Sequence, residues 1–403
     1  MTAHLIRYDD KNELAAALLK AGVSAESLPY FENRRETVQI YLTGVSAPAA
    51  NIIKQEMLSR GGDAAVHAQT IRCGVEKSDV VIFGTRKQLS FLAEKLAKMP
   101  WWGLEKCAKE IISLTAAAVI KKIALPSGAA LEFGRRMHLM GIINLTDDSF
   151  FEGSRSDGAA DAARRAVKMA ADGADILDLG AESTRPGAGR VPEETEISRM
   201  TEAVRAIRRE LPRMPLSIDT TRGSVAYSAL EAGADIINDV SGLTYDKEVA
   251  RAAARYRAML VVMHMRGTPE TMGDMCCYDN LISEVCCGLR ESAQTALELG
   301  VSSEYLITDP GLGFAKTHEQ NLELVRHCES FRALGWPVLI GASRKGFVGR
   351  ATGAEKAGER LAGTLAVTAL TCWQRADIIR VHDVKENKEV IKMTEAIRGA
   401  DNV

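Results

Sequence analysis

The chain of 403 residues contains no hydrophobic run approaching the roughly 18 residues that a membrane-spanning helix needs. Residues 1–13 mix charges of both signs and lack an apolar core ending in small residues, so we do not expect a secretory signal. Basic and acidic residues number 51 and 53, and this near balance provides no general positive field to attract nucleic acid or anionic lipid. We therefore expect neither a membrane partner nor a nucleic-acid partner.

Cysteine is too sparse for a disulfide framework, with eight residues in the whole chain. The adjacent pairs Cys276–Cys277 and Cys286–Cys287 lack the two-residue separation that suits a zinc site. Because free cysteine often behaves as a small buried hydrophobic residue, we interpret these four as reduced packing residues of a helix and the segment before it. Reduced thiols predict a cytoplasmic location.

Three motifs of common enzyme classes do not occur: GxGxxG, HExxH and GxSxG. Dinucleotide-binding, zinc-protease and serine-hydrolase functions are therefore poorly supported. The segment DPGLGFAKT at 309–317 resembles a phosphate-binding loop only superficially, because the GxxxxGK[ST] spacing is not met.

From about residue 138 the chain repeats one pattern, a short run rich in Ile, Val and Leu, then a polar loop, then an amphipathic stretch. This pattern is typical of a strand followed by a helix. Eight such runs occur, at residues 138–143, 174–179, 215–219, 234–240, 259–263, 305–309, 337–342 and 377–381. Eight parallel strands alternating with helices predict a (β/α)₈ TIM barrel, whereas an open doubly wound sheet usually has fewer strands.

The chain before the barrel shows no such series and predicts a smaller α/β domain. Strands are expected at 38–42 and 79–84, and helices at 48–62, 88–99 and 103–120. Pro and Gly interrupt the helical pattern at 124–136, where we expect a hairpin-like entry to the barrel. We therefore predict two domains, residues 1–130 and 136–403. An oligomerisation module, a docking module and a lid all fit the first one.

Polar residues collect directly after the predicted strands, which is where TIM barrels carry their active sites. They are Asn144, the segment 182–186, Asp219, Asn238, Asp239, His264, Asp309, the segment 343–345, Arg380 and His382. Scattered surface residues would not fall so regularly at strand ends. We therefore predict that these side chains converge on one mouth of the barrel.

Four of these residues suit a flat heterocycle whose edge alternates hydrogen-bond donors and acceptors: Asp219, Asn238, Asp309 and Lys345. A single Asp is explained about equally well as a helix N-cap or a solvated loop residue. Four such residues at one mouth favour a ligand site. Met263 and Phe314 suit the face of an aromatic ring, although barrel-core packing explains either one alone.

Positive charge is predicted at the same mouth from Arg185, Arg380 and His382. Arginine binds phosphate oxygens bidentately, so a diphosphate is a suitable ligand. Asn144 offers an oxygen ligand for Mg²⁺, which usually keeps several waters and bridges to substrate phosphates. A single Arg or His is more often a surface or core residue, so the clustering carries this prediction.

The motifs along the barrel, taken in order, resemble the dihydropteroate synthase family. They are GIINLTDDSF at 141–150, DLGAESTRPGA at 178–188, SIDT at 217–220, GADIINDVSG at 233–242, MHMRGTP at 263–269, DPGLGFAKT at 309–317, GASRKGFVG at 341–349 and RVHDV at 380–384. Eight motifs in the family's order are a specific signal, and they cover essentially the whole predicted barrel.

The resemblance implies a transferase of folate biosynthesis. In this reaction p-aminobenzoate displaces diphosphate from 6-hydroxymethyl-7,8-dihydropterin diphosphate and gives 7,8-dihydropteroate. The resemblance also implies Mg²⁺ as a cofactor and a homodimer. Because the arylamine has a free lone pair and the dihydropterin delocalises the charge left on its methylene, no strong general base is required.

The same resemblance assigns roles to individual positions. It implies that Asp219, Asn238, Met263, Asp309 and Lys345 bind the pterin. Asn144, Arg185, Arg380 and His382 are expected to bind the diphosphate, with Asn144 as the metal ligand. Thr184, Pro186, Phe314, Ser343 and Lys345 are expected around p-aminobenzoate, whose carboxylate would face the start of the helix after the Ser343–Lys345 segment. Catalysis falls to Asp219, Asp309, Lys345, Arg380 and His382.

Three positions depart from the family's pattern. Asp147 stands where Pro is common, Ala181 where a second Gly is usual, and Glu152 in place of Asp. All three lie in or beside the loops that are expected to close over the substrates. They bear on loop closure and leave the predicted binding residues unchanged.

Two other functions compete with the synthase. A pterin-binding methyltransferase would share the residues that hold the ring, but it has no need of GASRKGFVG and RVHDV. A non-catalytic pterin-binding protein would lose the phosphate residues, whereas all four are present here. The sequence therefore favours dihydropteroate synthase over both.

Overall fold

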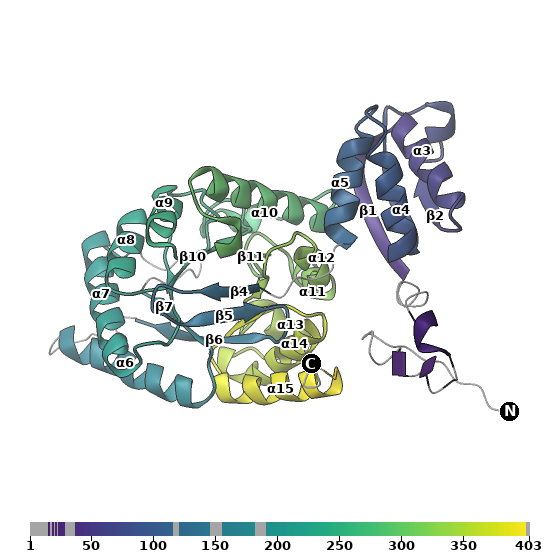
Figure 1. The fold of residues 1–403 in the computed structure, drawn as a ribbon. Coiled ribbons are helices and arrows are strands. Elements are labelled where there is room, and N and C mark those ends of the chain that lie inside the picture. Colours follow the sequence, from purple (N-terminus) through teal and green to yellow (C-terminus); the bar gives the residue numbers. More distant parts are fainter. Residues whose placement is uncertain are drawn as a thin grey trace. The chain divides into compact units, whose positions relative to one another are not determined.

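The computed structural model describes residues 15–16, 18–19, 21, 23–28, 37–115, 121–145, 155–181 and 191–399. The chain divides into two compact units, Met1–Ala117 and Ala118–Val403 (Figure 1). Within the described ranges, no helix combines the length and the apolar character needed to cross a membrane.

A three-stranded antiparallel sheet of order β1–β3–β2 forms the centre of the N-terminal unit. The elements are β1 (Thr37–Ser46), α3 (Ala47–Leu58), β2 (Asp63–Val66), β3 (Lys77–Thr85), α4 (Arg86–Leu96) and α5 (Leu104–Thr115), with 3-10 turns at Ala25–Ser27 and Thr70–Arg72. The helices pack on the sheet through a core that includes Ile53, Ile82 and Leu92. The unit is the α/β domain expected from the sequence. Strand β2 was missed, because four residues containing Asp and two Ala have little strand propensity.

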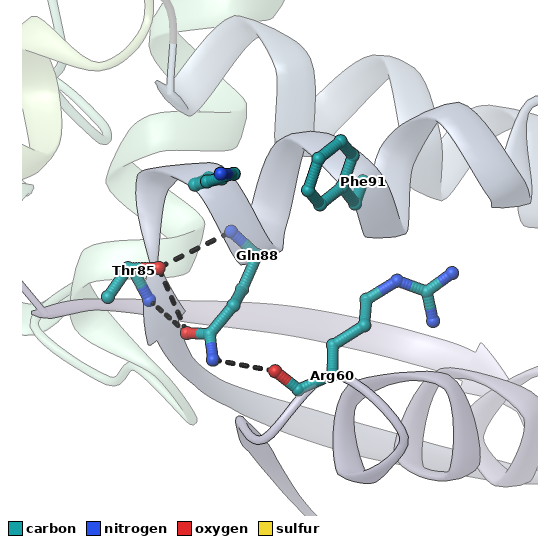
Figure 2. A pocket seen from close by; sticks show the side chains of 5 residues that line it. Arg60, Thr85, Gln88 and Phe91 are labelled. Carbon is teal, nitrogen blue, oxygen red and sulfur yellow. Dashed lines mark hydrogen bonds between the residues drawn. The ribbon is translucent and has the colours of Figure 1, made fainter. Parts of the chain in front are cut away.

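A cleft of about 490 Å³ lies in this unit beside the start of α4 (Figure 2). Its lining residues are Arg60, Thr85, Lys87, Gln88 and Phe91. Thr85 and Gln88 form a reciprocal capping box that satisfies the first turn of α4. Gln88 Nε2 also donates to the carbonyl of Arg60 at 2.8 Å. One glutamine therefore fixes both the start of α4 and the turn after α3.

The second unit contains an eight-stranded sheet in which every pairing is parallel, with order β11–β10–β9–β8–β7–β6–β13–β12. The strands are β6 (His138–Asn144), β7 (Ile176–Gly180), β8 (Leu216–Asp219), β9 (Ile236–Asp239), β10 (Met259–Met263), β11 (Leu306–Asp309), β12 (Leu339–Ile340) and β13 (Ile378–Val381). A parallel bridge between Thr308 and Val338 joins the two ends of the sheet. All eight predicted strands and the predicted TIM barrel are confirmed.

Helices follow the strands and cover the outside of the barrel (Figure 1). They are α6 (Arg155–Ala171), α7 (Glu193–Glu210), α8 (Gly223–Glu231), α9 (Glu248–Tyr256), α10 (Leu281–Glu298), α11 (His318–Arg326), α12 (Cys328–Arg332), α13 (Gly346–Thr352), α14 (Leu361–Trp373) and α15 (Val384–Ile397), with 3-10 turns at Met272–Asp274, Ser303–Tyr305 and Ala357–Glu359. Two large apolar clusters lie between strands and helices. The strands are apolar along most of their length because they are buried on both faces.

A hairpin of β4 (Lys121–Ala124) and β5 (Ala130–Phe133) covers the amino ends of the barrel strands. Its side chains Ile123, Leu131 and Phe133 form one apolar cluster with residues near the strand starts, including Ile176 and Ile236. The hairpin-like entry to the barrel expected at 124–136 is therefore present, and it belongs to the barrel unit. The first domain ends at Ala117 and not at the predicted residue 130, because this packing joins the hairpin to the barrel.

Three carboxylates lie at this amino rim, each directly before a strand: Asp175, Asp235 and Asp377. Asp235 accepts from Arg208 Nη2 at 2.5 Å and from the backbone N–H of Ser127 and Leu216. Asp175 and Asp377 likewise combine an arginine with a backbone N–H. These buried charges are paired, so the amino rim is a structural element that ties the hairpin and the helices to the strands.

Candidate active site

The opposite, carboxyl rim collects the described members of the predicted site from seven strands. The strand register places neighbouring site residues at the same height along the barrel axis. Asp219 pairs with Asn238, and Met263 pairs with Asp309. Asn144 ends β6, Arg380 lies in β13, and Ser343, Lys345 and His382 follow β12 and β13. Thr184, Arg185 and Pro186 lie outside the described residues, as do Asp147, Asp148 and Glu152. The described members of the predicted set thus lie at one end of one barrel.

Arg380 links two carboxylates across the rim. Its Nε donates to Asp178 Oδ2 at 2.6 Å, and its Nη2 donates to Asp219 Oδ2 at 2.8 Å. The side chain of Arg380 is 21% exposed. Nε and Nη2 are occupied, so among the described contacts Nη1 keeps its two N–H donors for a ligand.

Asp178 is a site residue that the sequence reasoning missed. It is fully buried on β7, and its Oδ1 has no hydrogen-bond partner among the described residues. The residue was overlooked because it lies two positions before the end of its strand, whereas the search used the residues at and after strand ends. The available signal was a carboxylate within the apolar run ILDLG, since a buried Asp needs a partner.

The carboxyl groups of this rim hold their protons more tightly than an exposed Asp does. Burial and the neighbouring Asp178 carboxylate raise the pKa of Asp219 to about 7, although Arg380 acts in the opposite direction. Burial also raises the pKa of Asp309, against the attraction of Lys345. Buried carboxyl groups with raised pKa values are typical of ligand-binding and catalytic sites, where they form hydrogen bonds to a ligand.

Lys345 and Phe314 form one side of the site. The Lys345 ammonium lies 4.9 Å from the centre of the Phe314 ring, within cation–π distance, and Nζ donates to the carbonyl of Leu312. Burial lowers the pKa of Lys345 to about 8, even though Asp309 favours its charge. A Cβ at Gly341 would lie within 4 Å of both Lys345 Nζ and Asp309 Oδ2, so Gly341 leaves open the space between them.

Ser343 and His382 join the loops that follow β12 and β13. Ser343 Oγ lies 3.0 Å from His382 Nδ1 and accepts from the His382 backbone N–H at 3.2 Å. The next residues form a second link, because Arg344 donates from Nε and Nη2 to the two oxygens of Asp383. Ser343, expected at the aminobenzoate, thus lies against His382, expected at the diphosphate. The two predicted subsites are neighbours.

Asn238 and Met263 are both buried between the acidic residues. Asp239, the next residue of β9, has a different role, since it accepts from Ser241 and from the backbone N–H of Leu243. It holds the turn after the strand. Asp239 is therefore a structural residue of this loop, whereas Asn238 is the residue predicted to bind a ligand.

Asn144 is the predicted magnesium ligand, and its surroundings fit that role. It is exposed at the carboxyl end of β6, and only its backbone carbonyl is engaged among the described contacts, by Arg165 at 3.0 Å. Among described residues no three His, Cys, Asp or Glu side chains form a metal-binding group. A single protein oxygen with the remaining ligands from water and phosphate fits Mg²⁺.

Comparisons with known proteins agree with this geometry. Residues 140–382 match the family of pterin binding enzymes. A dihydropteroate synthase of Synechocystis sp. is 42% identical over 274 residues, which cover 68% of this chain and 94% of that protein. The structure of Xanthomonas albilineans dihydropteroate synthase with 4-aminobenzoic acid is similar at a TM-score of 0.64 and 35% identity, covering 70% of this chain and 99% of that chain.

Some relatives match beyond the barrel, into the N-terminal unit. A probable bifunctional folylpolyglutamate synthase/dihydropteroate synthase of Halobacterium salinarum is 39% identical over 364 residues, which cover 90% of this chain and 43% of that protein. A match of this length extends well beyond the barrel. The small α/β unit therefore also precedes a barrel of this kind in another protein.

Proposed function

Because the chain belongs to the dihydropteroate synthase family of pterin-binding enzymes, we propose that its barrel joins p-aminobenzoate to 6-hydroxymethyl-7,8-dihydropterin diphosphate and releases diphosphate. The product is 7,8-dihydropteroate. The observation that carries this function is Arg380, which is held between Asp178 and Asp219 beside Asn238 and Asp309. A heterocycle and a diphosphate can both be held at such a rim.

The pterin ring is assigned to Asp219, Asn238, Asp309, Lys345 and Met263. The two carboxyl groups accept from ring N–H and amino groups, while the Asn238 amide can donate and accept. Met263 supplies a soft apolar surface for the face of the ring. The buried positions of Asn238, Met263 and Asp309 support this assignment, since an aromatic heterocycle needs an apolar wall with a few polar contacts.

The diphosphate is assigned to Arg380, His382, Asn144 and Arg185. Nη1 of Arg380 is the available donor group on the described side of the site. Asn144 would hold Mg²⁺ through its amide oxygen, and the ion would neutralise charge on the leaving diphosphate. The protein's own contribution is to orient fixed donors before the reaction, which lowers the cost of charge development.

The p-aminobenzoate is assigned to Phe314, Ser343 and Lys345, together with Thr184 and Pro186. Its amine attacks the exocyclic methylene with its own lone pair, a new C–N bond forms, and the C–O bond to the diphosphate breaks. The amine proton leaves to solvent. The electron-rich pterin stabilises positive charge on the methylene, and the Asp219 and Asp309 carboxyl groups lie on the same rim to stabilise it further. Lys345 and Arg380 therefore act on rate and binding.

The test is release of diphosphate by the purified protein given the dihydropterin diphosphate, Mg²⁺ and p-aminobenzoate, with each component omitted in turn. We expect release to require all three and the product to be 7,8-dihydropteroate. A folded protein that binds the pterin and releases no diphosphate would overturn the proposal.

We further propose that the protein is a cytoplasmic homodimer. Leu370 and Trp373 on α14 and Met393 and Ile397 on α15 are all at least 45% exposed, which is unusual for large apolar side chains. A second copy covering them would remove this surface from water. None of the eight cysteines forms a disulfide, which fits a reducing compartment. Light scattering should give a mass twice that of the monomer. Met393→Glu should lower the measured mass toward that of the monomer, whereas the control Lys392→Glu should leave it unchanged.

A further inference from the structure

The loop between β11 and α11 contains a strained turn. Ala315 has a φ of 50°, in the left-handed region that a residue with a Cβ avoids. Gly311 and Gly313 in the same loop also have positive φ, but glycine adopts it without strain. Ala315 is buried, so hydrogen bonds from water to its backbone groups do not offset the strain. Other contacts must hold this turn in place.

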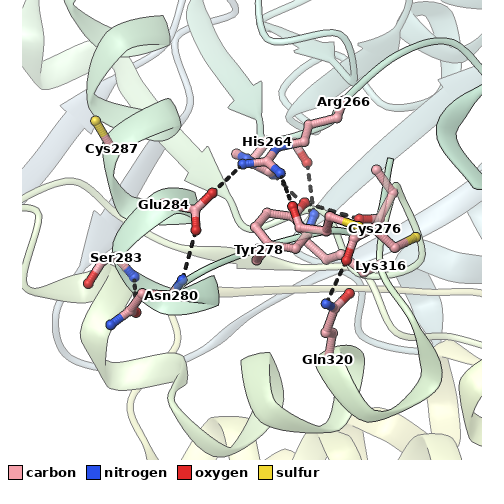
Figure 3. Close-up of polar contacts among 12 residues, drawn as sticks. His264, Arg266, Cys276, Tyr278, Asn280, Ser283, Glu284, Cys287, Lys316 and Gln320 are labelled. Carbon is pink, nitrogen blue, oxygen red and sulfur yellow. Dashed lines mark hydrogen bonds and ion pairs between the residues drawn. The ribbon is translucent and has the colours of Figure 1, made fainter. Parts of the chain in front are cut away.

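The side chains of Lys316 and Tyr278, both labelled in Figure 3, donate to the carbonyls on either side of Ala315. Lys316 Nζ donates to the carbonyl of Phe314 at 2.9 Å, and the Tyr278 hydroxyl donates to the carbonyl of Ala315 at 3.0 Å. These two peptide groups flank the strained φ angle. Fixing both of them keeps Ala315 in the left-handed conformation.

Lys316 connects this turn to the end of β10. Besides the Phe314 carbonyl, Lys316 Nζ lies 3.1 Å from His264 Nδ1 and donates to the backbone carbonyl of His264 at 3.4 Å. The Nζ atom therefore has three polar partners. Burial lowers the pKa of Lys316 to about 7, against the attraction of Asp309, and lysine is seldom buried without such partners.

Tyr278 is fixed from its other side. The Arg266 guanidinium lies 3.8 Å from the centre of the Tyr278 ring and pairs with Glu284 at 2.6 Å. Arg266 also donates to the carbonyl of Cys277 at 2.7 Å. Arg266 and Glu284 therefore hold the Tyr278 ring from the side opposite the turn (Figure 3).

The turn determines where the Phe314 ring lies. Phe314 precedes Ala315 directly, and its ring lies against Lys345 on the side of the site assigned to p-aminobenzoate. A relaxed Ala315 would change the direction of the chain at Phe314 and move the ring away from Lys345. The contacts of Lys316 and Tyr278 therefore affect the position of the Phe314 ring through the backbone conformation of Ala315.

We propose that Lys316 and Tyr278 are positioning residues that set the affinity for p-aminobenzoate by holding the strained turn at Ala315. This role rests on the proposed function, because it names the aminobenzoate as the ligand of the Phe314 side. Neither residue is assigned a contact with the substrate. Their effect is therefore specific to one substrate and passes through Ala315.

The experiment compares Tyr278→Phe, which removes one hydroxyl and keeps the ring under Arg266, with the wild type. We expect the KM for p-aminobenzoate to rise about fivefold, as the loss of one hydrogen bond would cause. The KM for the pterin and kcat should stay within about twofold of the wild-type values. Tyr305→Phe, far from this turn at the start of β11, is the matched control and should change neither KM.

The decisive comparison is between Tyr278→Phe and the double variant that also carries Ala315→Gly. Glycine takes a positive φ without help, so adding Ala315→Gly to Tyr278→Phe should return the aminobenzoate KM toward the wild-type value. A merely structural role of the hydroxyl would not be rescued at Ala315. Lys316→Met should act like Tyr278→Phe with a larger rise in KM, and its melting temperature reports whether it folds.

The outcomes separate the two proposals. A wild-type protein without synthase activity overturns the proposed function itself. An active wild type with an unchanged aminobenzoate KM in Tyr278→Phe overturns the positioning role, whatever Lys316→Met does. An equal rise in both substrate KM values, or a raised KM without rescue by Ala315→Gly, overturns it as well. A selective rise that Ala315→Gly reverses supports it.

Discussion

The two rims of the barrel both carry buried carboxylates, and they use them in different ways. At the amino rim, Asp235 accepts from one arginine and two backbone N–H groups. At the carboxyl rim, Asp219 and Asp178 share the single guanidinium of Arg380, and Asp178 Oδ1 has no partner among the described residues. The same residue type thus finds many donors at one end and few at the other.

The pKa values follow this difference. Burial alone would raise the pKa of Asp175 at the amino rim, but its hydrogen bonds with Arg136 and Leu139 outweigh burial and lower it. At the carboxyl rim, burial prevails and raises the pKa of Asp219 to about 7. Carboxylates whose hydrogen-bonding capacity is filled by protein donors stabilise the fold. Carboxylates with few protein donors keep hydrogen-bonding capacity for a ligand. Variants at the two rims should therefore have opposite phenotypes.

The largest effect is expected from Arg380→Ala. It removes the donor that serves the two carboxylates and the diphosphate, so kcat/KM should fall by about 100-fold or more. The melting temperature should change little, because one of the two carboxyl groups can take up a proton in place of the guanidinium. Steady-state kinetics and thermal melting on the same preparation check this. Normal turnover in a well-folded variant would remove Arg380 from the mechanism.

Arg208→Ala is the matched change at the amino rim. It leaves the fully buried Asp235 without its charged partner, which should cost about 3 kcal/mol of the free energy of unfolding. Turnover per folded molecule should match the wild type at a temperature where both variants are folded. Denaturant titration gives the first value and active-site-normalised kinetics the second. A selective loss of kcat would contradict the division between the rims.

Asp178→Asn should have an intermediate effect. The amide keeps the size of the carboxylate but removes the charge that holds Arg380, so kcat/KM should fall about tenfold. Ser217 neighbours Asp178 in strand register and is also buried, so Ser217→Ala is the control and should cost much less activity. Kinetics of the two variants side by side test this. Equal losses would mean that packing at this level of the barrel, and not charge, is what matters.

The smallest effect concerns pH and Asp219. Its folded pKa of about 7 lies above the ordinary value of 3.8, so the folded protein keeps a proton that the unfolded chain releases between these values. The stability that this proton contributes is fully present below about pH 4 and is lost as the pH rises through 7. Asp219→Asn should therefore flatten the fall of melting temperature across this range. An unchanged slope in the variant would place the ionisation elsewhere.

Much of the barrel was predictable because each strand is a short apolar run bounded by polar loops. This pattern is local in the sequence and needs no knowledge of distant residues. The hairpin entry to the barrel was expected, but the first domain was predicted to end at residue 130, because the packing of the hairpin against strand starts such as Ile176 and Ile236 is not local. Site residues at strand ends, such as Asp219 and Asp309, were found by position alone. Asp178 was missed because its role depends on Arg380, 202 residues later in the chain.

The contacts of Lys316 could not be predicted either. His264 lies 52 residues before it, and Tyr278 lies 37 residues before Ala315, so no spacing rule connects them. The left-handed φ of Ala315 leaves no trace in the sequence, since alanine predicts the opposite conformation. Sequence reasoning selected the residues that are expected to meet the substrates. It could not identify those that act through the backbone.

The apolar hairpin closes the amino end of the barrel. Its side chains Ile123, Leu131 and Phe133 pack against the strand starts, which leaves the carboxyl end as the open face for a ligand. Asp219, Asn238, Met263 and Asp309, assigned to the pterin, lie at strand ends, whereas Phe314, Ser343 and Lys345, assigned to the aminobenzoate, lie in the loops that follow strands. Under these proposed assignments, a molecule bound in the loops would lie between solvent and a ring held at the strand ends.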